Sequence, residues 1–324
     1  MDSERCFVSL NVILCIYLSV GEATFNNRPI IGIMTQETPS ELSQYGSTYL
    51  PATYVKFVES SGARVVPIFV NQSDSEYEDL FQSLNGLLLP GGVLDDQLMT
   101  SGYGRAGKMF YDLAKKKYDE NGDLFPILGI CQGYELLTRL AAGEDLLVSL
   151  ESNDENLNLT MSQGYRNSRI FGDAADWILE ALQNYAVTYN YHSFSVTPQD
   201  FNNSQPLRNT FKIVSTSRND EARDFVSIIE GNGYPFYGIQ FHPEKPIFVS
   251  SPETNIKHDV LSVNVSRYFA DFFVSEARKS NHSFESIQEE SAALIYNFNT
   301  VNLNGLENLD DVYFFQVPQN NTTH

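Results

Sequence analysis

The first half of the chain alternates short apolar runs with segments in which apolar residues recur at helical spacing. A continuous apolar run of roughly four to eight residues is typical of a buried strand, and recurrence every three or four residues is typical of an amphipathic helix. The predicted strands are residues 30–34, 64–70, 86–89 and 126–130, and the predicted helices are residues 50–60, 80–84, 108–117 and the stretch between Cys131 and Gly143. This order indicates a parallel sheet covered by helices on both faces.

The second half is less regular. Strands are predicted at residues 185–196, 211–215, 226–229 and 237–241, and an amphipathic helix is predicted at residues 265–279. No internal repeat and no Pro/Ser-rich linker divides the chain, so we expect one domain over residues 24–318 and a polar, flexible tail at residues 319–324. The predicted fold class is α/β, a three-layer sandwich with a mostly parallel central sheet.

Residues 1–23 have the pattern of a secretory signal peptide. Arg5 precedes an apolar stretch at residues 7–20, and Gly21 and Ala23 supply the small residues of a cleavage site. A membrane anchor is the alternative, but the apolar run is shorter than the roughly 20 residues that a spanning helix needs. We expect cleavage near Ala23 and a soluble mature protein without a membrane span.

The excess of acidic over basic residues limits which classes of partner the protein can bind. Asp and Glu number 41 against 21 Lys and Arg, which gives a formal net charge of −20. A polyanion is repelled by such a field, and the sequence contains no basic stripe. Nucleic acid is therefore excluded as a partner.

The predicted cleavage site also determines which cysteines the mature chain retains. Of the three cysteines, Cys6 and Cys15 lie in the predicted signal peptide, so Cys131 alone remains in the mature chain. No disulfide can form within one mature chain, and an unpaired thiol in a secreted protein indicates intermolecular pairing or a reactive role.

Asn-x-Ser/Thr sequons suggest glycosylation in the secretory pathway. They lie at Asn71, Asn158, Asn202, Asn264, Asn281 and Asn320, with a further one at the adjacent Asn321 that is hard to modify together with Asn320. Together with the predicted signal peptide, they lead us to expect that the protein passes through the secretory pathway.

The most distinctive local pattern is Gly129-Ile-Cys-Gln-Gly133, between an apolar strand and a helix. A nucleophile on such a turn stands above the sheet edge, and the glycines permit a sharp backbone. The positive end of the following helix is expected to lower the pKa of the Cys131 thiol and favour the thiolate. The alternative is a buried structural cysteine.

A thiol nucleophile needs a base, and His242 is the favoured candidate among the five histidines. It closes a predicted strand, and Glu244 follows two residues later, where an extended segment points its side chain in the same direction. We therefore predict a triad in which Cys131 is the nucleophile, His242 the general acid/base and Glu244 the residue that orients the imidazole. A strand-end histidine that only bonds a loop is the alternative.

Pro90-Gly91-Gly92 ends the third predicted strand, at the edge where open parallel sheets bind their ligands. The backbone amides of Gly92 and Gln132 could form an oxyanion hole there. An ordinary Pro-Gly turn is the alternative for this tripeptide.

The cysteine turn, the His-x-Glu pair and the Pro-Gly-Gly tripeptide, in their order along the chain, resemble the class I glutamine amidotransferase-like fold. Within that fold, the chain is similar to the gamma-glutamyl hydrolase family, also called folylpoly-gamma-glutamate hydrolases. The stretches that carry the resemblance are residues 28–36, 54–67, 85–92, 129–135, 190–195, 237–245 and 272–279.

The resemblance implies a cysteine-type hydrolase that cleaves gamma-linked glutamates from folylpolyglutamates through a thioester, in lysosomes or after secretion. It implies no metal and no cofactor, a small-molecule substrate and a homodimer. By position it assigns substrate-binding roles to Tyr54, Glu135 and His192. A polyanionic tail also needs local positive charge, for which Arg105 and Lys108 are the candidates.

Three features depart from the family pattern, and other functions stay open. The segment between Gly92 and Lys108 diverges, with Asp95 and Asp96 where basic residues can occur. Gln132 follows the cysteine where leucine is frequent, and Phe241 precedes the histidine where tryptophan is frequent. The alternatives are a hydrolase of other gamma-glutamyl amides, a glutaminase subunit, and a catalytically silent secreted binding glycoprotein. In an acidic compartment we expect a thiolate–imidazolium pair to stay competent where a neutral histidine base would be protonated.

Overall fold

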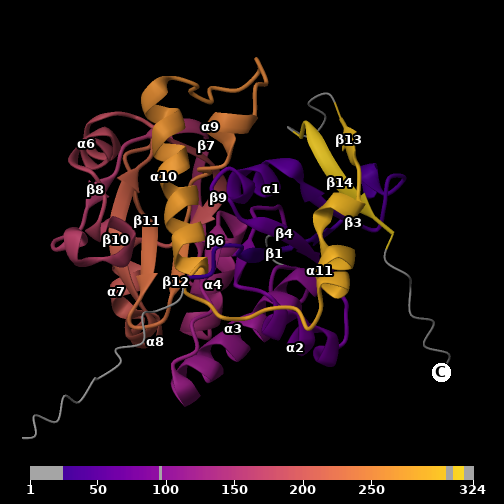
Figure 1. The fold of residues 1–324 in the computed structure, drawn as a ribbon. Helices are drawn as coiled ribbons and strands as arrows, with labels where there is room; N and C mark the ends of the chain where they lie inside the picture. Colours follow the sequence, from indigo (N-terminus) through magenta and orange to yellow (C-terminus); the bar gives the residue numbers. More distant parts are fainter. Residues whose placement is uncertain (1–24, 95–96, 304–308, 317–324) are drawn as a thin grey trace, which may run out of the picture.

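The computed structural model describes residues 25–94, 97–303 and 309–316, so the predicted signal peptide and the predicted tail lie outside the described residues. An eight-stranded sheet forms the centre of the molecule (Figure 1). Its order is β4 (Arg64–Ile68), β1 (Ile30–Met34), β5 (Gly86–Leu89), β6 (Ile127–Ile130), β12 (Phe236–Ile239), β11 (Asp224–Gly231), β10 (Phe211–Arg218) and β8 (Thr160–Met161). The first five strands are parallel and the last three are antiparallel additions, so the mostly parallel sheet is confirmed.

Helices cover both faces of this sheet because the central parallel strands β1, β5, β6 and β12 are buried on both sides. On one face, Ile31, Ile33 and Leu128 pack against α1 (Ala52–Glu59), α6 (Asp176–Asn184) and α10 (Val260–Ala277). The alternate residues Ile30 and Leu89 pack against the other layer, which contains α2 (Asp74–Ser83), α3 (Gly102–Asn121), α4 (Gln132–Ala142), α7 (Pro198–Asn203) and α8 (Gln205–Thr210). The predicted three-layer sandwich is confirmed. The shorter helices are α5 (Arg169–Gly172), α9 (Lys245–Phe248) and α11 (Ile287–Ala293).

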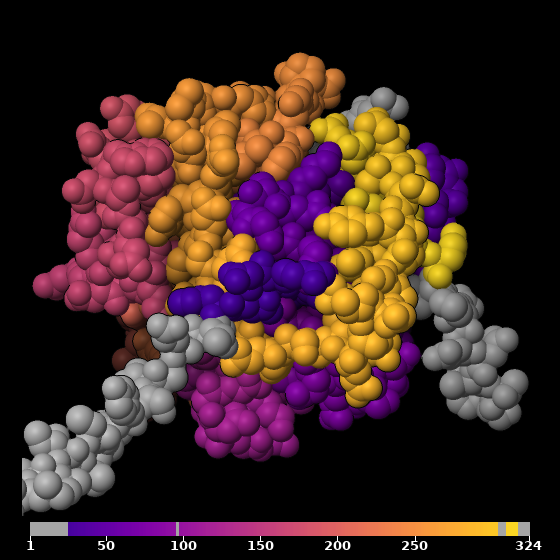
Figure 2. Space-filling view, viewed as in Figure 1, coloured from indigo at the N-terminus to yellow at the C-terminus, as the bar shows by residue number. Residues whose placement is uncertain are grey.

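Two smaller sheets flank the core. One contains β13 (Thr300–Asn302), β14 (Asp311–Phe315), β3 (Thr48–Pro51) and β2 (Gln36–Glu37) in that order, and the other pairs β7 (Val148–Leu157) with β9 (Thr188–Ser195). β14 lies antiparallel to β3, so the C-terminal strands, in yellow, lie directly against N-terminal segments, in indigo (Figure 2). Of the strands in these two sheets, the sequence pattern predicted β9 alone.

Several predicted boundaries were wrong for identifiable reasons. The helix predicted at residues 50–60 begins only at Ala52, because Leu50 precedes Pro51 and a residue before proline disfavours the helical conformation. The helix predicted at residues 80–84 begins at Asp74, after a capping box between Ser73 and Glu76 that the sequence already contains. The strand predicted at residues 237–241 ends at Ile239, so the histidine that follows lies in a loop.

One histidine far from the predicted site ties the segment after α10 to the opposite layer. His282 Nδ1 lies 2.7 Å from the carbonyl oxygen of Phe81 and 3.0 Å from that of Leu84, and Nε2 lies 2.9 Å from Asp123 Oδ2. Acceptors thus face both ring nitrogens, which requires the doubly protonated imidazolium. Burial alone would lower the pKa of His282, but Asp123 and the two carbonyls raise it above its ordinary value.

We therefore expect the fold to lose stability as pH rises. A histidine with a raised folded pKa contributes fully below its unfolded pKa, about 6.5, and that contribution is lost as pH rises through the folded pKa. Each unit of difference corresponds to about 1.4 kcal/mol of unfolding free energy. Urea unfolding from about pH 5 to about pH 9 should give wild type a steeper decline than His282→Gln, which preserves the sequon.

The matched control is His258→Gln, since the exposed His258 ring faces the single carbonyl of Pro246. It should follow the wild-type curve. Equal pH slopes in wild type and His282→Gln would contradict the imidazolium assignment.

Candidate active site

The turn between β6 and α4 presents Cys131 at the carboxyl edge of the sheet. Cys131 has φ 51° and ψ −110°, a strained conformation for a residue with a side chain. Its N–H donates to the carbonyl of Ile239 on β12 at 2.8 Å. A Cβ at Gly129 would overlap the backbone of Gly133, and a Cβ at Gly133 would overlap the carbonyl of Leu89. The two glycines are therefore required by close backbone contacts around the strained cysteine.

The loop after β12 brings a histidine–glutamate pair to the same edge. The His242 N–H donates to the carbonyl of Tyr189 at 2.8 Å, and His242 Nδ1 lies 2.8 Å from Glu244 Oε1. The helix α10 supports the loop from behind, where the Ser266 hydroxyl donates to the carbonyl of Pro243. Because Nδ1 faces the carboxylate, Nε2 is left to exchange a proton with substrate or nucleophile.

The carboxyl group of Glu244 is ionised although it is fully buried. Burial alone would raise its pKa, but the charge and hydrogen bond of His242, together with the charge of Lys245, lower the pKa below its ordinary value. A buried carboxylate beside the imidazole stabilises the imidazolium that forms during proton transfer.

The ionisation of the thiol differs from the prediction. Burial raises the pKa of the Cys131 thiol well above its ordinary value, and the charges of Glu135 and Glu244 raise it further. Lys245 and the N–H of Gln132 at the start of α4 lower the pKa, but they do not outweigh burial. The expected thiolate is therefore wrong for the free site, where the sulfur carries its proton and needs His242 to remove it.

The thiol and the imidazole border one small space. A Cβ built on Gly91 would lie 2.9 Å from His242 Cε1 and 3.2 Å from Cys131 Cβ, so Gly91 borders both the nucleophile and the base closely. On its other side, the Cys131 thiol donates to the carbonyl of Tyr191 at 3.7 Å.

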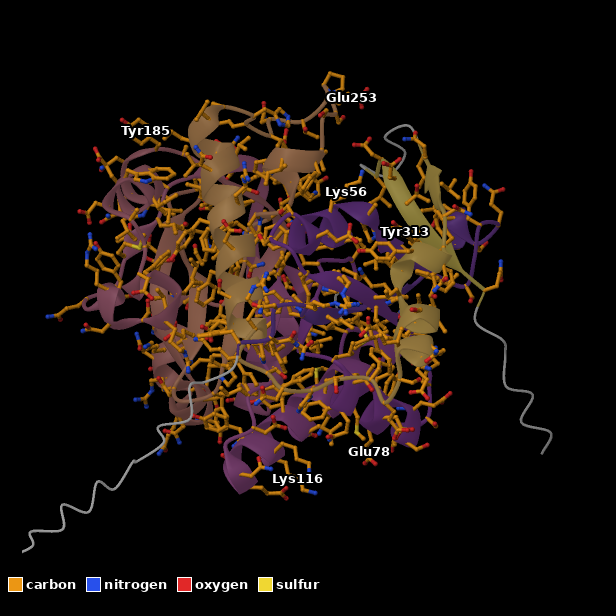
Figure 3. The ribbon with its side chains drawn as sticks, in the orientation of Figure 1. Lys56, Glu78, Lys116, Tyr185, Glu253 and Tyr313 are labelled. Atoms are coloured by element: carbon orange, nitrogen blue, oxygen red, sulfur yellow. The ribbon has the colours of Figure 1, made fainter. Side chains whose placement is uncertain are left out.

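A cavity of about 180 Å³ opens over this point. The predicted residues that line it are Cys131, His242, Glu244, Gly92 and Tyr54. Its wall also includes Tyr191, Lys245, Leu309, Asp310 and Asp311, the last three from the C-terminal segment before and at the start of β14. Figure 3 shows Lys56 on α1 and Tyr313 on β14 on the same side of the molecule, where Lys56 Nζ lies 2.8 Å from Asp311 Oδ2.

Tyr54 lies on the face of α1 that meets the cavity. Its hydroxyl accepts a hydrogen bond from the N–H of Gly91 at 2.9 Å. Burial, and then the charges of Glu244 and Cys131, raise the pKa of Tyr54 well above its ordinary value, so the phenol stays protonated. Its contact with substrate stays a prediction, but its contact with the glycine loop is direct.

The other two residues assigned to substrate, Glu135 and His192, are not among the residues that line the cavity. Glu135 is buried on α4, where its Oε1 accepts from Gln240 Nε2 at 3.3 Å. His192 is buried on β9 with its ring edge-on to Phe225, and burial together with the charge of His242 lowers its pKa to about 3. The structure does not place either side chain among the lining residues, and their roles toward substrate stay predictions.

The positive charge at the cavity comes from a residue to which the sequence assigned no role. Arg105 pairs with Asp74, and Lys108 pairs with Asp112; all four side chains are exposed, and none lines the cavity. Lys245 does line it and is the one lysine or arginine among the described lining residues. Its position directly after the His-Pro-Glu motif was the available signal.

The described sequons differ in accessibility. Asn71, Asn158, Asn202 and Asn281 are exposed, whereas Asn264 is half-buried within α10. The hydroxyl residue of the Asn264 sequon is Ser266, which is buried against the loop of the candidate triad. Asn320 lies outside the described residues.

Within residues 25–94, 97–303 and 309–316, no group of three or more His, Cys, Asp and Glu side chains is placed to hold a metal ion. No helix in these ranges is both long enough and apolar enough to cross a membrane.

Comparisons with known proteins show which family this chain is similar to. The model of the peptidase C26 family matches residues 29–244. Gamma-glutamyl hydrolase of Mus musculus is 40% identical over 310 residues, which cover 94% of this chain and 96% of the relative. The Homo sapiens enzyme of that name is 37% identical over 97% of this chain and 100% of the relative, and gamma-glutamyl hydrolase B of Dictyostelium discoideum is 36% identical over 92% and 86%.

Among solved structures, a glutamine amidotransferase from Thermotoga maritima is similar to 78% of this chain and 99% of its own, with 10% identity and a TM-score of 0.41. The family match and the near full-length relatives confirm the resemblance inferred from the sequence. The chain belongs to the peptidase C26 family.

Proposed function

We propose that the protein hydrolyses gamma-glutamyl bonds of folylpoly-gamma-glutamates and releases glutamate or short gamma-glutamyl chains through a thioester on Cys131. The observation that carries this proposal is the meeting of Cys131, His242 and Glu244 beside a glycine loop in one cavity, in a chain whose relatives are named gamma-glutamyl hydrolases.

The protonation state of the Cys131 thiol in the absence of substrate determines the first step of the reaction. Because the thiol is protonated, His242 Nε2 removes the proton as the sulfur attacks the gamma-carbonyl carbon. The carbonyl π electrons move to oxygen, where the N–H groups of Gly92 and Gln132 stabilise the negative charge. Glu244, bonded to Nδ1, stabilises the imidazolium formed in this step.

Collapse of the tetrahedral intermediate breaks the carbon–nitrogen bond. His242 gives its proton to the departing glutamate nitrogen, which leaves a thioester on Cys131. The neutral imidazole then removes a proton from water, the resulting oxygen attacks the thioester, and the thiolate leaves and regains its proton.

Lys245 supplies the local attraction for an anionic substrate. Its ammonium lies 5.5 Å from the ring centroids of both Tyr189 and Tyr191, so the two rings hold it at the cavity wall. Among the described residues, no carboxylate lies within salt-bridge distance of Nζ, which leaves the charge available to an alpha-carboxylate of the substrate. This local charge supports binding of an anionic substrate by a protein whose formal charge is −20.

Replacing Lys245 by methionine is expected to raise KM for folate pentaglutamate by about 10- to 100-fold, since a hydrogen bond to a charged group contributes about 1.5–3 kcal/mol. Steady-state kinetics should show a smaller fall in kcat, caused by loss of the charge that lowers the thiol pKa. Lys116→Met, at an exposed position on α3 away from the cavity, is the control (Figure 3). An unchanged KM would contradict a role in substrate binding.

The experiment that tests the proposed function compares two isomeric substrates. Purified protein is incubated with folate carrying five gamma-linked glutamates or five alpha-linked glutamates, and products are resolved by chromatography. The gamma-linked tail should shorten and the alpha-linked tail should stay intact, and pretreatment with iodoacetamide should stop the reaction. An intact gamma-linked tail would overturn the proposal and favour another gamma-glutamyl amide or a silent binding protein.

The mature form is proposed to be an N-glycosylated homodimer that passes through the secretory pathway to the lysosome or the medium. The predicted signal peptide and the four exposed sequons support this route. Protein recovered from secreting cells should lose mass on enzymatic removal of N-glycans, and light scattering of the deglycosylated protein should give twice the chain mass. Full-length, unglycosylated protein inside the cell would contradict the route.

A further inference from the structure

Two buried glutamine side chains lie under the glycine loop of the cavity. Gln36, on β2, and Gln132, the first residue of α4, are each 2% exposed. The Gln36 Nε2 donates to the carbonyl of Gly91 at 2.8 Å, and Gln132 Nε2 donates to Gln36 Oε1 at 3.3 Å. The N–H of Leu94 donates to Gln132 Oε1 at 2.7 Å. The two amides therefore form a bridge that begins and ends on the same loop.

The direction of every bond in this bridge is determined. Leu94 offers an N–H, so it must meet the oxygen of Gln132, which turns the amide nitrogen of Gln132 toward Gln36. The oxygen of Gln36 receives that bond, so its nitrogen faces the Gly91 carbonyl. Neither amide can turn over without placing two donors or two acceptors against each other in a buried site.

The loop is packed against the bridge as well as bonded to it. A Cβ at Gly92 would overlap Gln36 Oε1 and would lie 2.7 Å from Gln132 Nε2. On the other side of the loop, the Gly91 N–H donates to the Tyr54 hydroxyl at 2.9 Å. Gly91 is thus held at its N–H by Tyr54 and at its carbonyl by Gln36.

This arrangement orients a donor that neither glutamine touches. The Gly91 carbonyl and the Gly92 N–H belong to one peptide unit, and the described residues contain no cis peptide bond, so the two groups point in opposite directions. Holding the carbonyl against Gln36 therefore turns the Gly92 N–H away from the bridge. A Gly-Gly peptide resists rotation less than any other because neither residue has a side chain.

We propose that Gln36 and Gln132 are positioning residues that hold the Gly91–Gly92 peptide in the one orientation in which the Gly92 N–H can stabilise the oxyanion. The inference rests on the proposed acyl-transfer function. Gln36 acts directly on the peptide, whereas Gln132 acts through Gln36 and through the N–H of Leu94. The bridge also accounts for glutamine directly after the nucleophile: a leucine there has no amide to complete it.

The test separates oxyanion stabilisation from activation of the thiol. Gln36→Met retains an unbranched side chain of similar length and removes both amide bonds. Hydrolysis of folate pentaglutamate passes through an oxyanion, whereas alkylation of Cys131 by iodoacetamide does not. We expect kcat of Gln36→Met to fall by about 10- to 100-fold with KM within about two-fold, below the loss of about 10²- to 10³-fold for removing an oxyanion donor outright. The alkylation rate should stay within about two-fold of wild type.

Two further variants strengthen the design. Gln132→Leu should lower kcat in the same direction, and the double variant should lose no more than about the larger single loss, because both residues act on one peptide. Gln183→Met is the matched control, since its amide donates to the Leu179 carbonyl within α6 and Gln183 does not line the cavity. It should leave kcat and alkylation unchanged.

The outcomes distinguish the alternatives. A parallel fall in kcat and alkylation rate would assign the bridge to the nucleophile and overturn the proposal, as would an unchanged kcat in folded Gln36→Met. Circular dichroism and Tm establish folding of each variant. If wild type fails to cleave the substrate while its thiol is still alkylated, the proposed function is wrong but the bridge is still testable. A gamma-glutamyl aldehyde forms a tetrahedral adduct with the thiol, and it should then inhibit Gln36→Met more weakly than wild type.

Discussion

Cys131→Ala is expected to lower kcat for folate pentaglutamate by at least about 10⁴-fold, since the proposed pathway runs through a covalent bond to this sulfur. Cys131 is buried at the turn between β6 and α4, and alanine meets the same backbone strain at φ 51° as cysteine does. Removal of one atom leaves the cavity wall otherwise unchanged, so substrate affinity should stay within a few-fold. Chromatographic product analysis measures the first quantity and calorimetric titration the second.

Cys131→Ser is the control for polarity at this position. A hydroxyl occupies nearly the same space but is a weaker nucleophile, so Cys131→Ser should remain within about ten-fold of Cys131→Ala. Turnover of Cys131→Ala near the wild-type rate would contradict a thioester and leave His242 and Glu244 to activate water directly.

Gly91→Ala is expected to lower kcat by about 10³-fold through a methyl group placed close to both the nucleophile and the base. The new carbon would lie 2.8 Å from the Tyr54 hydroxyl, 2.9 Å from His242 Cε1 and 3.2 Å from Cys131 Cβ, and separations this short force the neighbours to move. A displacement of about 1 Å at reacting groups lowers rates by about 10²-fold, and here the thiol, the imidazole and the glycine loop all shift.

The matched variant for this experiment is Gly172→Ala at the end of α5, where an added Cβ would meet one atom, the Arg166 carbonyl oxygen, at 3.6 Å. Gly172→Ala should retain wild-type kinetics and Tm. For Gly91→Ala, kinetics of alkylation by iodoacetamide should slow together with kcat, because the thiol and its base are both displaced. Retention of kcat would show that the imidazole reaches the thiol by another path.

The parts of the site that could be predicted from sequence are those held by local backbone geometry. Gly129 and Gly133 flank the nucleophile because the backbone passes too close for side chains, a local requirement that leaves a visible motif. His242 and Glu244 are two residues apart, so their pairing also follows from local geometry. The strand–helix alternation predicted the central sheet because it, too, is a local pattern in the sequence.

The parts that could not be predicted depend on contacts between distant segments. The thiol pKa is set by burial and by Glu135 and Glu244, which outweigh the helix end that the sequence made visible. The helix α3 was predicted too short because Gly102, Gly104 and Gly107 in its first turns resemble a loop. There, Gly104 packs against the carbonyl of Leu98 and Gly107 against Leu136, contacts that require the folded chain.

The pairing of β14 with β3 has a consequence for the biosynthesis of the protein. Leu309, Asp310 and Asp311 form part of the cavity wall, and β14 is aligned by a strand that directly precedes α1 and Tyr54. The parallel sheet and the cysteine turn consist of residues before 300, so a nascent chain that still lacks residues 309–311 contains them without a complete cavity wall. The cavity is therefore complete only after the last strand has been synthesised. A ribosome-bound or prematurely terminated chain contains the three residues of the candidate triad but lacks this part of the cavity wall.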